Sequence, residues 1–181
     1  MRKIVLCVIF LLLLMHSNAF CLLDDGMRAP EFFITSGDDK NISLNQLKGS
    51  VITIFYETKE KEVIEQNREL KNELNQFYKD QPDSIRKQVS RLAVINCSGA
   101  VWPFKGIWAK NLIKNSVKEG ITIYGDWDGS FFEKYKIIKG ESNFIIIDKR
   151  GIVRYSKAGK IEQTEFFAIK ELLKKLALES A

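Results

Sequence analysis

Three cysteines and one histidine limit the covalent chemistry that this chain can perform. Cys7, His16 and Cys21 all lie near the start, so Cys97 is the one thiol deep inside the rest of the sequence. It follows an apolar run at 91–96, and strand ends of this kind build sites in α/β proteins. A thiol without a histidine partner is either a peroxidatic or metal-binding group, or a small apolar residue. A Cys21–Cys97 disulfide is a further alternative.

Acidic residues at the end of another apolar run are a second candidate. The run at 51–56 is β-branched and aromatic, and Thr58, Glu60 and Glu62 follow it. Thr58 fits a helix N-cap, and the two glutamates suit the positive end of the helix dipole. These residues therefore either start a helix and do nothing else, or belong to a binding loop.

Two aspartates, Asp126 and Asp128, form the segment "DWD" and raise the question of calcium. The segment lacks the further oxygen ligands and the distal glutamate of a calcium loop. We therefore expect no metal, and we assign no cofactor. Ser130 and Glu133 have the spacing of a capping box and predict a short helix here.

Four large aromatic residues lie in or near two expected loops. They are Trp102, Phe104, Trp108 and Trp127. One interpretation is that they cover the core. The other is an apolar recognition patch, because tryptophan is favoured at binding hot spots.

The first nineteen residues have the pattern of a cleaved secretory signal. Arg2 and Lys3 precede an apolar run at 4–15, and small residues occupy 17–19. This run is too short for the roughly 20 residues of a membrane span. We predict cleavage after Ala19.

Residues 20–181 are then a single domain without a transmembrane span, and the expected location is the periplasm. The net charge falls from +5 to +3, because two of the 28 basic residues leave and all 23 acidic residues stay. No basic cluster interleaved with aromatics is present, so we expect no nucleic-acid partner. Lipid attachment at Cys21 is disfavoured, since Phe20 is bulky where such signals want a small residue.

Periodicity predicts an alternation of strands and helices. Strands are expected at 51–56, 91–96 and 121–124, helices at 59–79, 107–120 and 162–178, and a hairpin at 143–148 and 152–156. A short strand or helical turn is expected near 42–49, after a first strand that ends near 35. This order suggests a sheet covered on both faces.

Several segments resemble the redoxin and TlpA-like branch of the thioredoxin fold. Gly26, Ala29, Pro30 and Phe32 match its opening Gly-x-x-Ala-Pro-x-Phe, and "DWDGSFFEKYKI" and "IIIDKRGIVRY" resemble two later segments. The resemblance implies an α/β fold with a thioredoxin-like central mixed sheet flanked by helices and an N-terminal strand extension.

The second half of the chain also resembles the YtfJ family of small periplasmic thioredoxin-like proteins. The matching residues are Asn96, Gly106, Asp126, Gly129, Ser142, Asp148 and Gly151. The helix expected at 59–79 shares its placement with that family but little identity.

Alignment with redox-active members of the fold places Glu60 and Val63 at the two positions of Cys-x-x-Cys. Ser142 takes the place of the cis-proline, and we expect an ordinary trans bond there because a non-proline cis bond costs about 3 kcal/mol. The resemblance therefore implies a non-catalytic exported protein that binds another envelope protein or a peptide. The alternative is a divergent single-cysteine redoxin, a peroxidase or thiol transferase, that uses Cys97.

Overall fold

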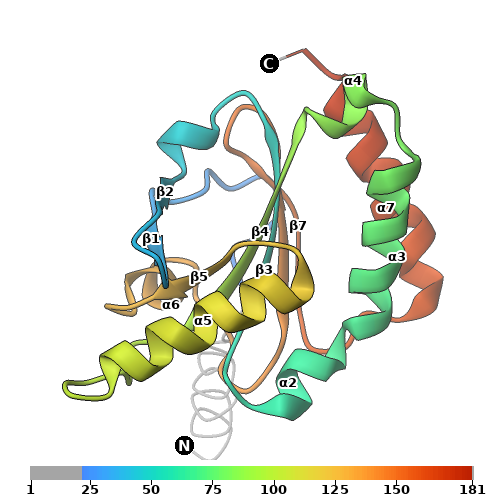
Figure 1. Cartoon of the computed structure of the whole chain (residues 1–181). Coiled ribbons are helices and arrows are strands. Elements are labelled where there is room, and N and C mark those ends of the chain that lie inside the picture. The colour runs from blue at the N-terminus through green and yellow to red at the C-terminus, as the bar shows by residue number, and fades with distance from the viewer. Residues whose placement is uncertain (1–21, 181) are drawn as a thin grey trace, which may run out of the picture.

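The computed structural model describes residues 22–180, so the predicted signal peptide and Cys21 lie outside the described residues. Seven strands form one mixed sheet in the order β2-β1-β5-β4-β3-β6-β7 (Figure 1). Their bounds are β1 Phe33–Ser36, β2 Asn41–Ser43, β3 Val51–Glu57, β4 Val89–Asn96, β5 Ile123–Asp126, β6 Asn143–Ile147 and β7 Val153–Ala158. The expected mixed sheet is confirmed.

Strands β3 and β4 form the centre of the sheet. They pair in parallel from Val51↔Val89 to Glu57↔Ile95, and β6 lies antiparallel on the other side of β3. Strand β3 is therefore hydrogen-bonded along both edges. On the far side of β4, β5 pairs with it in parallel. The apolar, β-branched composition of β3 suits a strand with both faces covered.

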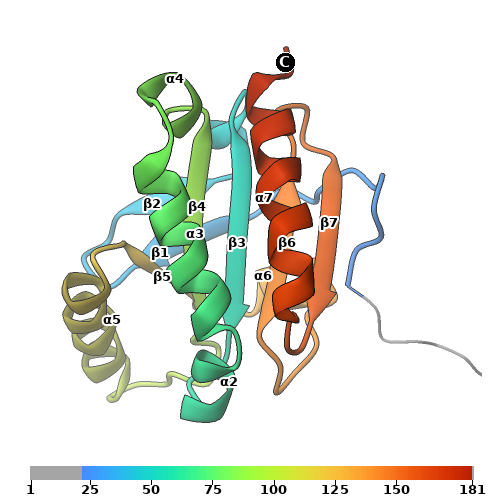
Figure 2. The same cartoon turned by 90° about the vertical axis from the view of Figure 1, so that its right-hand side faces the viewer.

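Helices cover the two faces of the sheet unequally. In Figure 2, α3 (Arg68–Asp80) and α7 (Gln163–Leu178) stand in front of the sheet, and α5 (Lys105–Glu119) lies to their left and contacts β5 and β1. The short helices α6 (Ser130–Lys134) and η1 (Asn45–Leu47) contribute to the core cluster of the opposite face. A four-residue helix, α4 (Asp83–Arg86), which the sequence did not predict, leads into β4.

The prediction of a single helix at 59–79 is wrong. The structure has α2 (Lys61–Gln66) and then α3, with a break at Asn67. Asn67 has φ −115° and ψ 28°, and its buried side chain donates to the Gly159 carbonyl and accepts from the Ile161 amide. These two bonds draw Asn67 towards the segment before α7, which explains why the helix is interrupted there.

The first residues of α2 and α6 differ from those expected from the sequence, whereas the start of α7 agrees. Glu60, not Thr58, is the N-cap of α2, and no side chain caps it. Gly129 precedes α6 with a positive φ of 76°, so the expected capping box is absent there. At α7 the capping box of Glu162 and Glu165 is present.

The segment before β1 runs along the outer strand β7. The Gly26 amide donates to the Val153 carbonyl at 2.8 Å, and the Val153 amide donates to the Met27 carbonyl at 2.9 Å. Arg28 also forms an isolated antiparallel bridge with Ile152. The N-terminal extension thus continues the sheet beyond its seventh strand.

Candidate binding site at the end of the central strand

The three residues aligned with redox positions have different environments. Glu60 is exposed, whereas Val63 is buried on the inner side of α2 and Ser142 is fully buried before β6. The Ser142 amide donates to Gln66 Oε1 at 2.7 Å, which ties this turn to α2. Within residues 22–180 the one cis peptide bond is Trp102–Pro103, so the bond before Ser142 is trans as expected.

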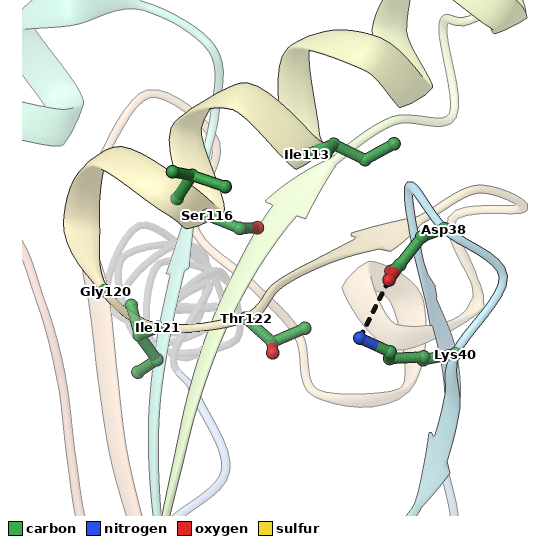
Figure 3. Close-up of a pocket in the computed structure, with 8 residues that line it drawn as sticks. Asp38, Lys40, Ile113, Ser116, Gly120, Ile121 and Thr122 are labelled. Atoms are coloured by element: carbon green, nitrogen blue, oxygen red, sulfur yellow. Dashed lines mark ion pairs between the residues drawn. The ribbon is translucent and has the colours of Figure 1, made fainter.

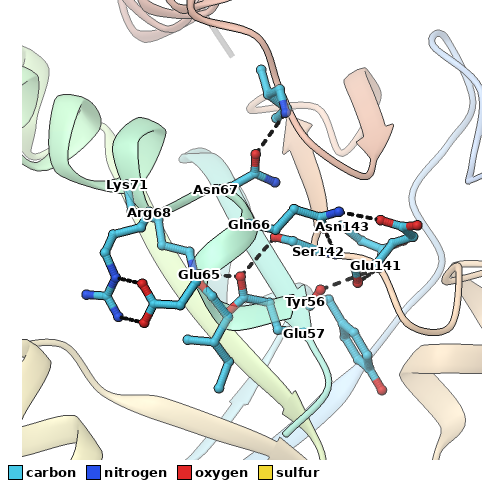
Figure 4. Close-up of polar contacts among 12 residues, drawn as sticks. Tyr56, Glu57, Glu65, Gln66, Asn67, Arg68, Lys71, Glu141, Ser142 and Asn143 are labelled. Atoms are coloured by element: carbon cyan, nitrogen blue, oxygen red, sulfur yellow. Dashed lines mark hydrogen bonds and ion pairs between the residues drawn. The ribbon is translucent and has the colours of Figure 1, made fainter. Parts of the chain in front are cut away.

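An acid–base pair of buried Glu57 and partly buried Lys71 occupies the end of β3. Lys71 Nζ donates to Glu57 Oε1 at 2.5 Å and to the Ile64 carbonyl at 2.9 Å (Figure 4). Ser142 Oγ donates to the same Glu57 oxygen at 2.9 Å. Ser142 therefore contacts the acid that ends the central strand.

Burial raises the pKa of Glu57, while the Lys71 ammonium and the Ser142 hydroxyl act in the opposite direction. The carboxyl group has its partners inside the protein and holds the lysine against the sheet. This pair was not predicted from the sequence, because the strand expected there ends at Tyr56. A charged residue at the end of an otherwise apolar strand was the available signal.

Amide side chains fix the turn that precedes β6. Gln66 Nε2 donates to Glu141 Oε2 at 2.6 Å, and Asn143 Nδ2 donates to the Glu141 carbonyl at 2.7 Å. Asn143 also donates to the Ile138 carbonyl at 3.0 Å. Together with Ser142 these contacts set the position of the turn relative to α2, and Figure 4 shows Gln66, Glu141, Ser142 and Asn143 side by side.

Cys97 is a core residue at the end of β4, with 0 % of its surface exposed. Burial, followed by the nearby Asp126 carboxylate, raises the pKa of its thiol to about 12. Gly125 allows this packing, because a Cβ there would lie 2.7 Å from the Trp127 ring and 3.1 Å from Cys97 Sγ. Both burial and protonation oppose a nucleophilic role.

Asp126 uses its carboxylate inside the protein. It accepts from the Tyr56 hydroxyl at 2.8 Å and from the Phe132 amide at 2.9 Å. Asp128 Oδ1 accepts from the Ser130 amide. Nowhere in residues 22–180 do three or more acidic, cysteine or histidine side chains gather as metal ligands.

The four aromatics singled out in the sequence fall into two pairs. Trp102 is 89 % exposed and Phe104 is 56 % exposed. Trp108 and Trp127 are partly buried against Cys97, and the Trp127 indole donates to the Thr35 carbonyl at 2.8 Å. Trp108 and Trp127 therefore cover part of the core, and Trp102 and Phe104 are accessible at the surface.

We call Val101, Trp102 and Phe104 the apolar loop. All three side chains are exposed and directly precede α5. No helix formed within residues 22–180 is long and apolar enough to cross a membrane.

A groove of about 730 Å³ lies between α3 and α5, and we call it the α3–α5 groove. Phe55 of β3 and Ala93 and Ile95 of β4 contribute to its floor and are partly exposed. Trp108 lines the side formed by α5, and the Lys59 ammonium lies 5.1 Å from the centre of that ring. No pattern in the sequence predicted this groove.

A smaller hollow of about 270 Å³ lies near the carboxyl end of α5 (Figure 3). Its two charged residues, Asp38 and Lys40, are exposed and pair with each other at 2.8 Å. One of its hydroxyl groups, Ser116 Oγ, already donates to the Leu112 carbonyl and accepts from the Ile123 amide.

Comparison with solved structures identifies the architecture. The exposed lipoprotein thioredoxin Etrx1 of Streptococcus pneumoniae has a TM-score of 0.59 and 18% identity, over 81% of this chain and 100% of that one. The thioredoxin domain of a thiol-disulfide oxidoreductase of Bacteroides vulgatus gives 0.58 and 16%, over 83% and 99%. StoA of Bacillus subtilis gives 0.55 and 18%, over 81% and 97%. The fold is thioredoxin-like.

No protein-family model matches the chain, and no curated protein matches it. At these identities the thioredoxin-like neighbours establish the fold alone. The positions aligned with Cys-x-x-Cys and the candidate thiol belong to different elements. Exposed Glu60 is the N-cap of α2 and buried Val63 lies within it, whereas buried Cys97 follows β4.

Proposed function

We propose that this chain is an exported, non-catalytic protein of thioredoxin-like fold that binds another envelope protein or a peptide. The apolar loop carries the proposal, since its three exposed side chains include Trp102 at 89 %. Aromatic residues of this kind dominate the energetics of protein interfaces. The residues shared with the YtfJ family support membership of that family, and the pattern of residues 1–19 supports a periplasmic location.

The rival role as a single-cysteine redoxin has less support. Attack on a peroxide requires an accessible thiolate, and Cys97 is inaccessible with a pKa raised to about 12. The alignment of Glu60 and Val63 with the cysteine positions leaves no dithiol in that place. The Glu57–Lys71 pair gives the end of β3 a structural role.

Site-specific photo-crosslinking in intact cells tests the binding role. A crosslinking residue at Val101 is expected to capture a discrete protein or peptide. The matched control is Val117, which is 80 % exposed on α5 but lies outside the apolar loop. Capture at position 101 should disappear with Trp102→Ala. No adduct, or the same adducts from both positions, would contradict the proposal.

Oxidation of the purified protein tests the rival separately. With substoichiometric peroxide and a sulfenic-acid trap, Cys97 is expected to stay unmodified in the folded protein and to react after unfolding in guanidinium. Rapid oxidation of the folded protein that is lost in Cys97→Ser would overturn the non-catalytic assignment. The measurement is the intact mass, followed by mapping of the modified peptide.

A further inference from the structure

The floor of the α3–α5 groove is unusual for its position in the sheet. Strand β4 lies inside the sheet between β5 and β3, and such parallel strands are normally covered on both faces. Ala93 and Ile95 nevertheless remain partly exposed on the groove side, as does Phe55 of the neighbouring strand. The volume of about 730 Å³ lies within the roughly 300–1,000 Å³ of small-molecule sites.

The charges around the groove favour an anionic occupant. The lining contains six basic and three acidic side chains: Lys59, Lys61, Arg68, Lys71, Arg91 and Lys118 against Glu57, Glu65 and Glu119. Each acid has a basic partner in Lys71, Arg68 or Lys118 respectively. In the described part of the chain, Lys59, Lys61 and Arg91 form no ion pair. Three basic side chains of the described residues thus lack a salt-bridge partner beside an apolar floor, and the carboxylates of Glu60 and Glu65 act on Lys59 and Lys61 from a longer distance.

The backbone beneath the groove favours an apolar chain over a peptide. Strand β4 is paired along both sides, with β3 and with β5, so the floor is a sheet face and not a free edge. An extended peptide gains its affinity from main-chain bonds to a sheet edge. Laid across this face, its own amides would lose water without gaining partners. A hydrocarbon chain has no such groups to satisfy.

The length of the floor also fits an acyl chain. Residues 91–97 cover six steps of roughly 3.3 Å, or about 20 Å. The acyl chains of one membrane leaflet extend about 15 Å, half of the roughly 30 Å hydrocarbon core.

We propose that the α3–α5 groove binds a fatty-acid-like anion, with its acyl chain on Phe55, Ala93 and Ile95 and its carboxylate at Lys59 and Lys61. The head group is assigned to this end because two lysines without a salt bridge lie here, whereas the other end has Arg91 alone. Arg91 donates to Asn75 Oδ1 at 2.7 Å and lies over the Tyr78 ring. This site is separate from the apolar loop.

Displacement of a fluorescent polyene fatty acid by palmitate, below the concentration at which palmitate forms micelles, tests the site in the purified protein. Saturable one-to-one binding is expected. Asn111→Trp places bulk in the groove from an exposed position of α5 and should weaken binding at least tenfold. The matched control, Val117→Trp, adds the same bulk on α5 outside the groove and should bind as the unmodified protein does. Circular dichroism verifies that both variants fold.

Two further comparisons test the head group. The double variant Lys59→Gln and Lys61→Gln should weaken palmitate binding about tenfold. The control double variant, Lys110→Gln and Lys114→Gln, removes equal charge from α5 outside the groove and should bind palmitate as the unmodified protein does. Methyl palmitate, which lacks the charge, should compete poorly. Absence of saturable binding, equal losses in the matched controls, or equal competition by the methyl ester would each overturn the proposal. Trp102→Ala should leave palmitate binding intact, so this result is independent of the crosslinking result.

Discussion

Two halves of the same sheet face differ in how they are covered. Under α3 and α7, the inward side chains of Val51, Phe144 and Ile146 are fully buried. Under α3 and α5, Ala93 and Ile95 remain partly exposed and a groove is left above them. One helix, α3, borders both halves. The difference shows that the covered half supplies stability, whereas the open half is the part of this face available for binding.

The largest effect is expected in the covered half. Leu173→Ala removes a fully buried side chain of α7 and should lower the free energy of unfolding by about 2–5 kcal/mol. Ile95→Ala is the counterpart in the open half and should cost about 1 kcal/mol, because less apolar surface is lost from the core. Denaturant unfolding measures both. Equal losses would erase the distinction between the halves.

The acid–base pair at the end of β3 comes next. Lys71→Met removes the ammonium that Glu57 contacts and should cost about 1–3 kcal/mol at neutral pH, since the buried carboxylate then keeps the Ser142 hydroxyl as its remaining hydrogen-bond contact. Adding Glu57→Gln should cost less than the sum of the two single changes. Denaturant unfolding of the four proteins in the cycle gives the coupling. Strict additivity would show that the pair contributes nothing to stability.

A smaller effect concerns pH. Burial raises the pKa of Glu57 in the folded protein above its unfolded value, so the folded state binds the proton more tightly. The resulting stabilisation is fully present below the unfolded value of about 4.3 and is lost as the pH rises through the raised folded pKa. The stability of the unmodified protein relative to Glu57→Gln should therefore fall across this window. Denaturant unfolding of both proteins at a series of pH values measures this difference in the free energy of unfolding. A difference that rises with pH would mean that the pKa of Glu57 is lowered in the folded protein.

The smallest effect is expected at the apolar loop. Trp102→Ala should change the free energy of unfolding by no more than about 0.5 kcal/mol, because the side chain is almost wholly exposed. Thermal unfolding measures the change. A loss above 1 kcal/mol would mean that Trp102 supports the fold and would remove the main reason to regard it as a contact residue.

The elements with strong patterns were predictable from sequence. The apolar run of β3 and the leucine-rich stripe of α7 both formed where expected, and Glu162 with Glu165 begins α7. Strand β5 runs from Ile123 to Asp126, two residues later than expected. Boundaries are less certain because backbone pairing, not composition alone, decides where a strand ends.

The break at Asn67 escaped prediction because Asn67 fits the helical spacing of its neighbours. What interrupts the helix is a pair of bonds to Gly159 and Ile161, more than 90 residues away. The Glu57–Lys71 pair escaped for a related reason, since two separate elements create it.

The groove was also beyond sequence analysis. Ala93 and Ile95 look like ordinary core residues in the run at 91–96. Their exposure depends on where α3 and α5 lie above β4, which is a property of the assembled layers. For the four aromatics, sequence identified the residue types but not which pair would be buried.

The N-terminal extension has a consequence for self-association. An outer strand with free amides and carbonyls is a template for pairing with other molecules. Here one outer strand, β2, has only three residues. The other, β7, has its Val153 amide and carbonyl occupied by Met27 and Gly26. The extension therefore occupies the start of this edge, and pairing with another molecule is blocked at Val153.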